Sequence, residues 1–161
     1  MIRKGTIGDA AQMAEIFNHY VETSEVIFSN RILTEADMRE RLEPVAGKYP
    51  FFTDENSDGL LTGYCYAHAF HPDPVYGATW ELTEYLRHGH TGGGTGTALL
   101  RTTIEECRRA GAHTLIATVT AGNEPCERML ARLGFRQAGI LRDAGYKFGR
   151  YLDDVFFQLM L

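Results

Sequence analysis

The chain has 161 residues, of which 44% are hydrophobic and 23% are charged, and its formal net charge is −5. A chain of this size predicts one domain, residues 1–161, with a core large enough to need no disulfide or metal. The acidic balance argues against a nucleic-acid partner, because neutralising phosphates requires clustered lysines and arginines. No apolar stretch reaches the length of a membrane span, and the first residues lack the apolar core of a signal peptide. Three widely spaced cysteines without a CxxC pair predict reduced thiols in a cytoplasmic protein.

The first part of the chain is expected to form a short strand followed by two helices. The strand lies near Ile2. Asp9 is predicted to cap the first helix, with Gln12 three residues later completing a capping box. The second helix is predicted over about Glu35–Leu42, with Thr34 as its cap. The first helix carries one apolar stripe at helical spacing, formed by Met13, Ile16, Phe17, Tyr20 and Val21.

Three strands are expected next, near Phe51–Asp54, Leu60–Ala69 and Thr79–Leu86. The segment Asn56–Gly59 between the first two is typical of a hairpin turn, because Asp-Gly supplies the positive φ that such turns require. The third of these strands leads into a glycine-rich run, which the next helix follows directly.

The second half of the chain alternates helices and strands. The helix after the glycine run ends before Gly111, and the near-continuous apolar run Thr114–Thr120 predicts a central strand. Pro125 suits the first turn of a further helix, and Gly134 suits its end. Two final strands are expected at Phe135–Leu141 and Asp154–Leu161. The order β-α-α-β-β-β-α-β-α-β-β predicts a mixed-sheet α/β fold.

The run Gly92-Gly93-Gly94-Thr95-Gly96 predicts a phosphate-binding loop. A strand end, a loop without bulky side chains and a helix start leave backbone N–H groups pointing into one concavity, where the positive helix end attracts an anion. A flexible glycine-rich turn is the alternative. The P-loop pattern fails because Thr97-Ala98 stands where Lys-Ser or Lys-Thr is needed, and the dinucleotide pattern fails because its sixth position falls on Thr97 or Leu99.

The segment His90–Leu100 resembles the acetyl-CoA signature of the GNAT acetyltransferases, whose core is Gln/Arg-x-x-Gly-x-Gly/Ala. Further matching segments cover the whole chain and resemble the branch that contains the phosphinothricin and methionine sulfone/sulfoximine acetyltransferases. These segments are Phe17–Ser24, Phe28-Ser29, Asn123–Pro125, Leu133–Phe135 and Tyr146–Asp153.

The resemblance implies the GNAT fold: a mixed, mostly antiparallel central sheet, splayed between its fourth and fifth strands and flanked by helices. The pantetheine arm of acetyl-CoA would lie in that gap, paired with backbone groups near Tyr85 and Leu86, and Asn123 would contact it. The pyrophosphate would be held by the loop and the helix start, namely Thr91, Gly92, Gly93, Gly94, Thr95, Gly96, Thr97 and Ala98.

Acetyl transfer to an amine needs a base for the ammonium proton, stabilisation of the carbonyl oxygen, and a thiolate that can leave. The resemblance makes Glu81 the general base, and a solvated edge-strand glutamate is the alternative. Glu84 is expected to point to the opposite face, unless a bulge alters the alternation. Leu130 stands where relatives carry a Tyr or His acid, and it completes the apolar stripe of its helix, so the acid is unassigned.

The acceptor is expected to be the primary amine of a small molecule, such as phosphinothricin or methionine sulfoximine. Thr91 stands where the motif has Gln or Arg, and Gly93 stands where a basic residue is common, so cofactor binding would depend on backbone donors. Asp73, in the loop His71–Tyr76, replaces a basic residue of the relatives and would repel an acceptor's acidic group. The candidate acceptor residues are Phe28, Tyr76, Lys147 and Arg150, although the last two could instead pair with Asp153 or Asp154 at the surface.

Two other functions are compatible with the same motifs. One is acetylation of a protein N-terminus or lysine, and a closed, aromatic-lined pocket would argue against it. The other is a non-catalytic acyl-CoA sensor. The six histidines show no metal-ligand spacing, so no metal is expected. A homodimer is expected from the relatives alone.

Overall fold

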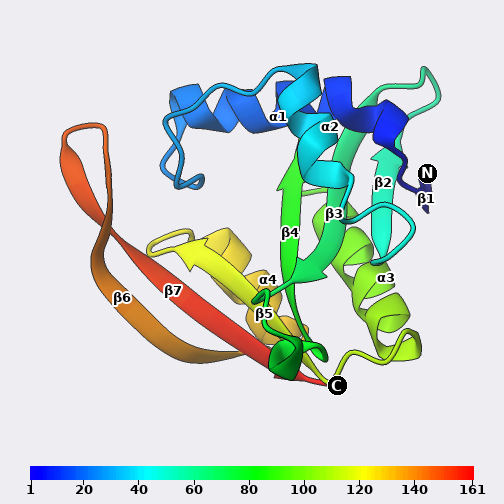
Figure 1. Ribbon diagram of the computed structural model, residues 1–161. Helices are drawn as coiled ribbons and strands as arrows, with labels where there is room; N and C mark the ends of the chain where they lie inside the picture. The colour runs from blue at the N-terminus through cyan, green and yellow to red at the C-terminus, as the bar shows by residue number, and fades with distance from the viewer.

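The computed structural model describes residues 1–161 (Figure 1). Its strands are β1 Ile2–Lys4, β2 Phe51–Glu55, β3 Leu61–Ala69, β4 Thr79–Leu86, β5 Thr114–Thr120, β6 Arg136–Lys147 and β7 Arg150–Met160. Its helices are α1 Ala10–Thr23, α2 Glu35–Leu42, α3 Thr95–Arg109 and α4 Glu124–Arg132, with short 3-10 turns at Ile7–Asp9 and Pro74–Tyr76. The predicted order of helices and strands is confirmed.

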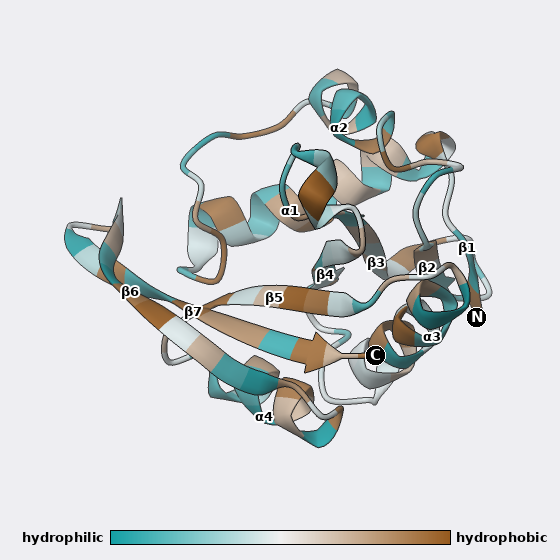
Figure 2. Cartoon of the chain, turned by 60° about the horizontal axis from the view of Figure 1, so that its bottom comes forward, coloured by the Kyte–Doolittle hydropathy of each residue, from teal (hydrophilic) through white to brown (hydrophobic).

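All seven strands form one sheet in the order β1-β2-β3-β4-β5-β7-β6. Strands β4 and β5 pair in parallel, and every other neighbouring pair is antiparallel. The near-continuous apolar strand Thr114–Thr120 lies centrally in this sheet, as predicted. In Figure 2 this strand is brown over part of its length and pale elsewhere. Most of its residues are buried, because both faces of a central strand are covered.

Two hydrophobic cores lie on opposite faces of the sheet. Helices α3 and α4 cover one core, which includes Leu99, Leu115 and Leu130. Helices α1 and α2 cover the other, which includes Met13 and Leu42. None of the helices is long and apolar enough to cross a membrane.

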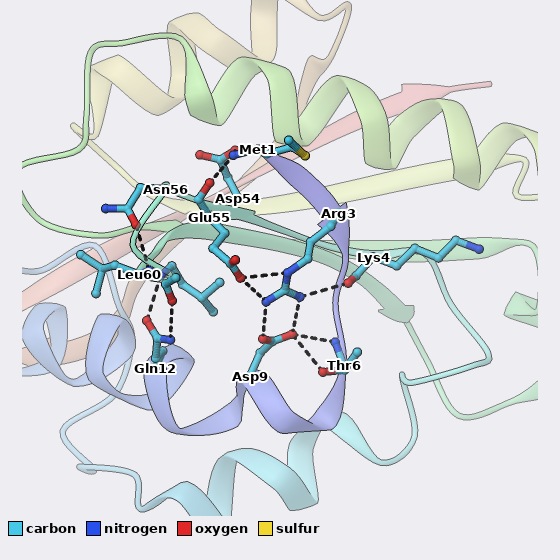
Figure 3. A network of polar contacts seen from close by, with 12 residues as sticks. Met1, Arg3, Lys4, Thr6, Asp9, Gln12, Asp54, Glu55, Asn56 and Leu60 are labelled. Carbon is cyan, nitrogen blue, oxygen red and sulfur yellow. Dashed lines mark hydrogen bonds and ion pairs between the residues drawn. The ribbon is translucent and has the colours of Figure 1, made fainter.

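The predicted capping box at the start of α1 is wrong. The Asp9 side chain makes no cap hydrogen bond to α1; instead it accepts the Thr6 backbone N–H at 2.8 Å and two bonds from the Arg3 guanidinium (Figure 3). Gln12 crosses to β3, where its Oε1 accepts the Leu61 N–H at 2.8 Å. The same sequence also fits a box one turn earlier, from Thr6 to Asp9, and Arg3 on β1 favours that arrangement.

The last two strands are much longer than predicted. Strands β6 and β7 extend to a tight turn at Phe148 and Gly149, which both have positive φ, and the hairpin reaches well past the end of β5 (Figure 1). Nearly every β6 side chain is exposed. Alternation of apolar and polar residues marks a strand only when one face is buried, so this extension left no pattern in the sequence.

Lys147 fixes this hairpin to the connection between α1 and α2. Its side chain is buried, and Nζ donates to the backbone carbonyls of Tyr20, Ser24 and Ile27 at 3.3, 2.6 and 3.0 Å. The Tyr20 carbonyl also accepts the Ser24 N–H, but the carbonyls of Ser24 and Ile27 depend on this ammonium group, since a buried polar group without a partner is costly.

We expect Lys147→Met to lower the free energy of unfolding by about 2–3 kcal/mol, because hydrogen bonds to a charged group are lost and buried carbonyls are left unpaired. Urea denaturation of the whole chain measures this value. The control is Lys4→Met, at an exposed lysine, which should change stability by less than about 0.5 kcal/mol. Equal losses in the two variants would contradict the anchoring role of Lys147.

Candidate active site

The sheet is open between β4 and β5. The two strands pair only from Thr79 with Thr114 to Leu82 with Ala117. Beyond this point β4 stays paired with β3 through Leu86, and β5 stays paired with β7 through Thr120. The predicted splay between the fourth and fifth strands is therefore confirmed.

A cleft of about 1030 Å³ lies at this opening and is lined from both faces of the sheet. We call its two parts the α1 side and the α3 side. The α1 side comprises Phe17, Tyr20, Phe28, Arg41, Glu81, Tyr85, Thr118 and Asp154. The α3 side comprises Glu84, Thr91, Gly92, Gly94, Gly96, Thr97, Asn123, Cys126 and Met129.

The glycine loop presents unpaired backbone donors at the α3 side. The N–H groups from Thr91 to Gly94 have no hydrogen-bond partner in the protein, and α3 begins directly afterwards at Thr95. The first N–H groups of a helix also lack a helical acceptor. Gly92 and Gly94 have φ of +83° and +87°, which side chains rarely adopt, and a Cβ there would meet no protein atom within 4 Å. The loop is thus an open cradle suited to an anion.

Along the end of strand β4, the backbone N–H and C=O groups of every second residue face the gap. The Arg87 N–H bonds to the Thr62 carbonyl on β3 at 2.8 Å, so the backbone of Leu86 faces the other way, toward the gap. By the same alternation the backbone of Tyr85 faces β3, and its ring lies on the α1 side. The Leu86 carbonyl already accepts the Tyr20 hydroxyl at 2.7 Å.

Asn123 caps α4 at the edge of the cleft, where its side-chain oxygen accepts the Cys126 N–H at 3.4 Å. Leu130, one turn further on, is only 2% exposed and belongs to the core under α3 and α4. The helix therefore offers no acid at that position, in agreement with the apolar stripe that its sequence predicts.

Glu81 and Glu84 lie on opposite sides of the sheet, as the alternation predicts. Glu81 is half-buried on the α1 side, and its Oε1 accepts the Thr118 hydroxyl at 2.8 Å. Glu84 faces α3 and α4, and its Oε1 is buried without a hydrogen-bond partner. Burial raises the pKa of Glu84 well above 4.5, which favours the protonated form of this carboxyl in the folded chain.

Asp154 is a cleft residue that sequence reasoning missed. It pairs with Thr120 in the β5–β7 ladder and lies on the same side of the sheet as Glu81. Burial, together with the charge of Glu81, raises its pKa to about 6. The alternation with buried Val155 and Phe157 could have revealed its direction. The sequence prediction began this strand at Asp154, so Asp154 was interpreted as a polar residue at the strand end and not as an inward-facing residue of its interior.

The structure separates the predicted acceptor residues. Phe28 lines the cleft, whereas Tyr76 lies outside it, exposed and packed against His71. The Lys147 ammonium group donates its hydrogen bonds to the three backbone carbonyls described above. Arg150 pairs with Glu25, which replaces the surface pairs with Asp153 or Asp154 that the sequence left open.

Asp73 also lies outside the cleft, so it does not oppose an acidic group bound there. Its carboxylate accepts the Val75 N–H at 3.0 Å and caps the short turn Pro74–Tyr76. No three His, Cys, Asp or Glu side chains gather as metal ligands.

Comparison with known proteins identifies the class to which this fold and cleft belong. Residues 2–156 match the family described as the acetyltransferase (GNAT) domain. The chain therefore belongs to the GNAT acetyltransferase family, and the seven-stranded, splayed sheet is the GNAT fold.

Individual relatives with named activities are similar to this chain over nearly its whole length. The chain is 33% identical to phosphinothricin N-acetyltransferase from Streptomyces viridochromogenes, over 98% of this chain and 85% of the relative. It is 32% identical to L-methionine sulfoximine/L-methionine sulfone acetyltransferase from Salmonella typhimurium, over 99% and 94%. A phosphinothricin acetyltransferase from Sinorhizobium meliloti, solved in complex with acetyl-CoA, has a TM-score of 0.95 at 28% identity, covering 100% of this chain and 88% of that one. The protein is thus an acetyl-CoA-dependent N-acetyltransferase.

The α3 side of the cleft fits this co-substrate. Its open glycine cradle supplies N–H donors for a pyrophosphate, and a Leu86 backbone N–H directed into the gap suits an amide-bearing arm. Burial raises the pKa of Glu84, which disfavours a negative charge beside the cradle. Acetyl-CoA supplies the acetyl thioester as acyl donor.

We expect Asp154 to make acceptor binding depend on pH. As the pH rises through about 6, Asp154 loses its proton and adds a negative charge to the α1 side, which attracts an ammonium group. The KM for an amine should fall roughly 3- to 10-fold between pH 5 and pH 7.5. Steady-state kinetics of Asp154→Asn should show no such fall. The control is Asp153→Asn, at a carboxylate that is bound by Arg142 outside the cleft. If Asp154→Asn keeps the fall in KM, the assignment is wrong.

Glu84 gives a stability prediction with a definite sign. The folded chain holds this proton more tightly than the unfolded chain, so raising the pH above 4.5 lowers the stability of the wild type. Glu84→Gln cannot ionise and should melt roughly 2–6 °C above the wild type at pH 8, with a smaller difference at pH 5. Thermal denaturation at both pH values measures this difference, and Glu22→Gln on the exposed surface is the control. Parallel curves for the wild type and Glu84→Gln would contradict the prediction.

Proposed function

We propose that this enzyme transfers the acetyl group of acetyl-CoA to the primary amine of a small amino-acid analogue, with Glu81 as general base. The named relatives, which act on phosphinothricin and on methionine sulfoximine or sulfone, support this acceptor class. The aromatic lining of the α1 side, by Phe17, Tyr20, Phe28 and Tyr85, supports a small molecule over a protein segment.

The observation that carries the proposal is the position of Glu81. Glu81 lies on the last stretch of β4 that still pairs with β5, and its carboxylate lines the α1 side of the cleft where the gap begins. The hydroxyl of Thr118 on β5 donates to Oε1 and fixes its direction, which leaves Oε2 for the acceptor. Glu81 takes one proton from the ammonium group, and the amine nitrogen then bonds to the acetyl carbon as the carbon–sulfur bond breaks. The acylated nitrogen releases its second proton to solvent, and the thiolate takes its proton from solvent, because Leu130 supplies none.

The donor half of the proposal assigns the pyrophosphate to the N–H groups of Thr91–Ala98 and the pantetheine arm to Leu86 and Asn123. Thr91 and Gly93 contribute no positive side chain, so we propose that recognition depends on these backbone donors and the start of α3. The exposed apolar side chains of the β6–β7 hairpin support a homodimer; they are Leu141, Tyr146, Phe148 and Tyr151.

We expect Glu81→Gln to lower kcat about 10²- to 10⁴-fold, since the amide cannot accept the ammonium proton. Acetyl-CoA affinity should stay close to that of the wild type, because Glu81 lies on the α1 side. Release of the CoA thiol measures turnover with a panel of phosphinothricin, L-methionine sulfoximine, L-methionine sulfone and simple amines. Glu22→Gln, on the exposed face of α1, is the matched control.

The panel also tests the other two functions. Thiol release with protein N-termini or lysine peptides but with no small amine would replace the proposal by protein acetylation. Binding of acetyl-CoA without turnover of any amine would support a sensor. Turnover that persists unchanged in Glu81→Gln would show that another group is the base.

A further inference from the structure

One cation on the α1 side of the cleft has no partner. Arg41 lies in the last turn of α2, with its guanidinium carbon 4.9 Å from the centre of the Phe17 ring. It makes no ion pair and no side-chain hydrogen bond, yet it lines the cleft. The other two arginines of the cleft, Arg128 and Arg132, lie on α4 at the α3 side. Arg41 is therefore the single positive charge on the α1 side.

The neighbouring charges of α2 do not neutralise Arg41. Arg39 pairs with Glu35, one turn before it. Asp37 lies one turn before Arg41, but its carboxylate is already bound by Thr34 and Arg31. An arginine held over an aromatic ring, with its donors free and facing a cavity, is suited to bind a carboxylate or a similar anion through two parallel hydrogen bonds.

Arg41 and Glu81 border one group of aromatic side chains. The positive charge of Arg41 lowers the pKa of the Tyr66 and Tyr85 hydroxyls, against the larger effect of their burial, and the charge of Glu81 raises it. Arg41 and Glu81 are far apart in the sequence, but both charges lie near these two tyrosines in the fold. The α1 side offers a cation, an aromatic floor and the carboxylates of Glu81 and Asp154.

We propose that Arg41 binds the acidic group of the acceptor while its ammonium group lies toward Glu81 and Asp154. This inference rests on the proposed function and adds a residue that selects acceptors bearing a carboxylate or comparable anion. The loop His71–Tyr76 cannot perform this task, because it lies outside the cleft and carries Asp73 in place of a cation. In this proposal the residue that selects the acceptor by its acidic group is therefore Arg41 on α2.

The test compares acceptors that differ only in the carboxylate. The probes are L-methionine sulfone and its decarboxylated amine, with L-phenylalanine and phenethylamine as a second pair. The wild type should prefer the amino acid of each pair. In Arg41→Gln the KM for the amino acids should rise about 10- to 100-fold, with kcat within about threefold and the decarboxylated amines unaffected. Arg41→Lys should recover part of the loss, because it restores charge without the two-pronged geometry.

The matched control is Arg39→Gln on the same helix, outside the cleft, which should leave every KM unchanged. Equal effects of Arg41→Gln on both members of a pair, or no effect on either, would overturn the role of Arg41 while leaving the acetyltransferase intact. Binding of L-methionine sulfone by calorimetry is a second readout. If no small amine is turned over, the proposed function fails, and loss of binding in Arg41→Gln still supports the anion site. Binding unchanged by that substitution overturns it.

Discussion

The cleft depends on a parallel strand pair that stops halfway. Strands β4 and β5 pair from Thr79 with Thr114 to Leu82 with Ala117, and each then keeps only its outer neighbour. Backbone groups that would close the sheet are left facing a gap, and an unpaired backbone group away from water is costly. Pairing with β3 and with β7 holds the two half-sheets independently of each other. The gap therefore offers hydrogen-bonding edges to a ligand without a rearrangement of the sheet.

Strand alternation gives the two sides of the gap different chemistry. Because side chains alternate along β4, Glu81 and Glu84 are separated by the sheet itself, although only two residues lie between them. Glu81 shares the α1 side with Thr118 and Asp154, where a carboxylate can meet an amine. Glu84 lies beneath the start of α3, where burial raises its pKa beside the phosphate cradle. The sheet thus places the two carboxyls in different surroundings.

Elements with a strong local signal could be predicted from the sequence, and those held by distant contacts could not. Helix α2 and strand β5 have the predicted bounds, because a cap marks the helix and a near-continuous apolar run marks the strand. The outer half of the β6–β7 hairpin has no buried face and depends on Lys147, whose three acceptors lie more than 100 residues away. Arg41 and Asp154 were missed for the same reason: each enters the cleft only when α2 or β7 packs beside β4.

Whether a lysine or arginine has a partner within the protein also distinguishes structural from functional residues. In a chain with a net charge of −5, most arginines find a carboxylate, and Arg150 is held by Glu25 in this way. Lys147 is saturated by backbone carbonyls, so neither of these two cations is free to meet a ligand, although sequence comparison favoured both. Arg41 differs because it makes no ion pair, because Asp37 one turn before it is already bound, and because its guanidinium lies against an aromatic ring at the cleft. A cation that the fold leaves without a protein partner at the wall of a cleft has its hydrogen-bond donors available for an anion, and this makes it a stronger candidate for recognition than one selected by its place in a motif.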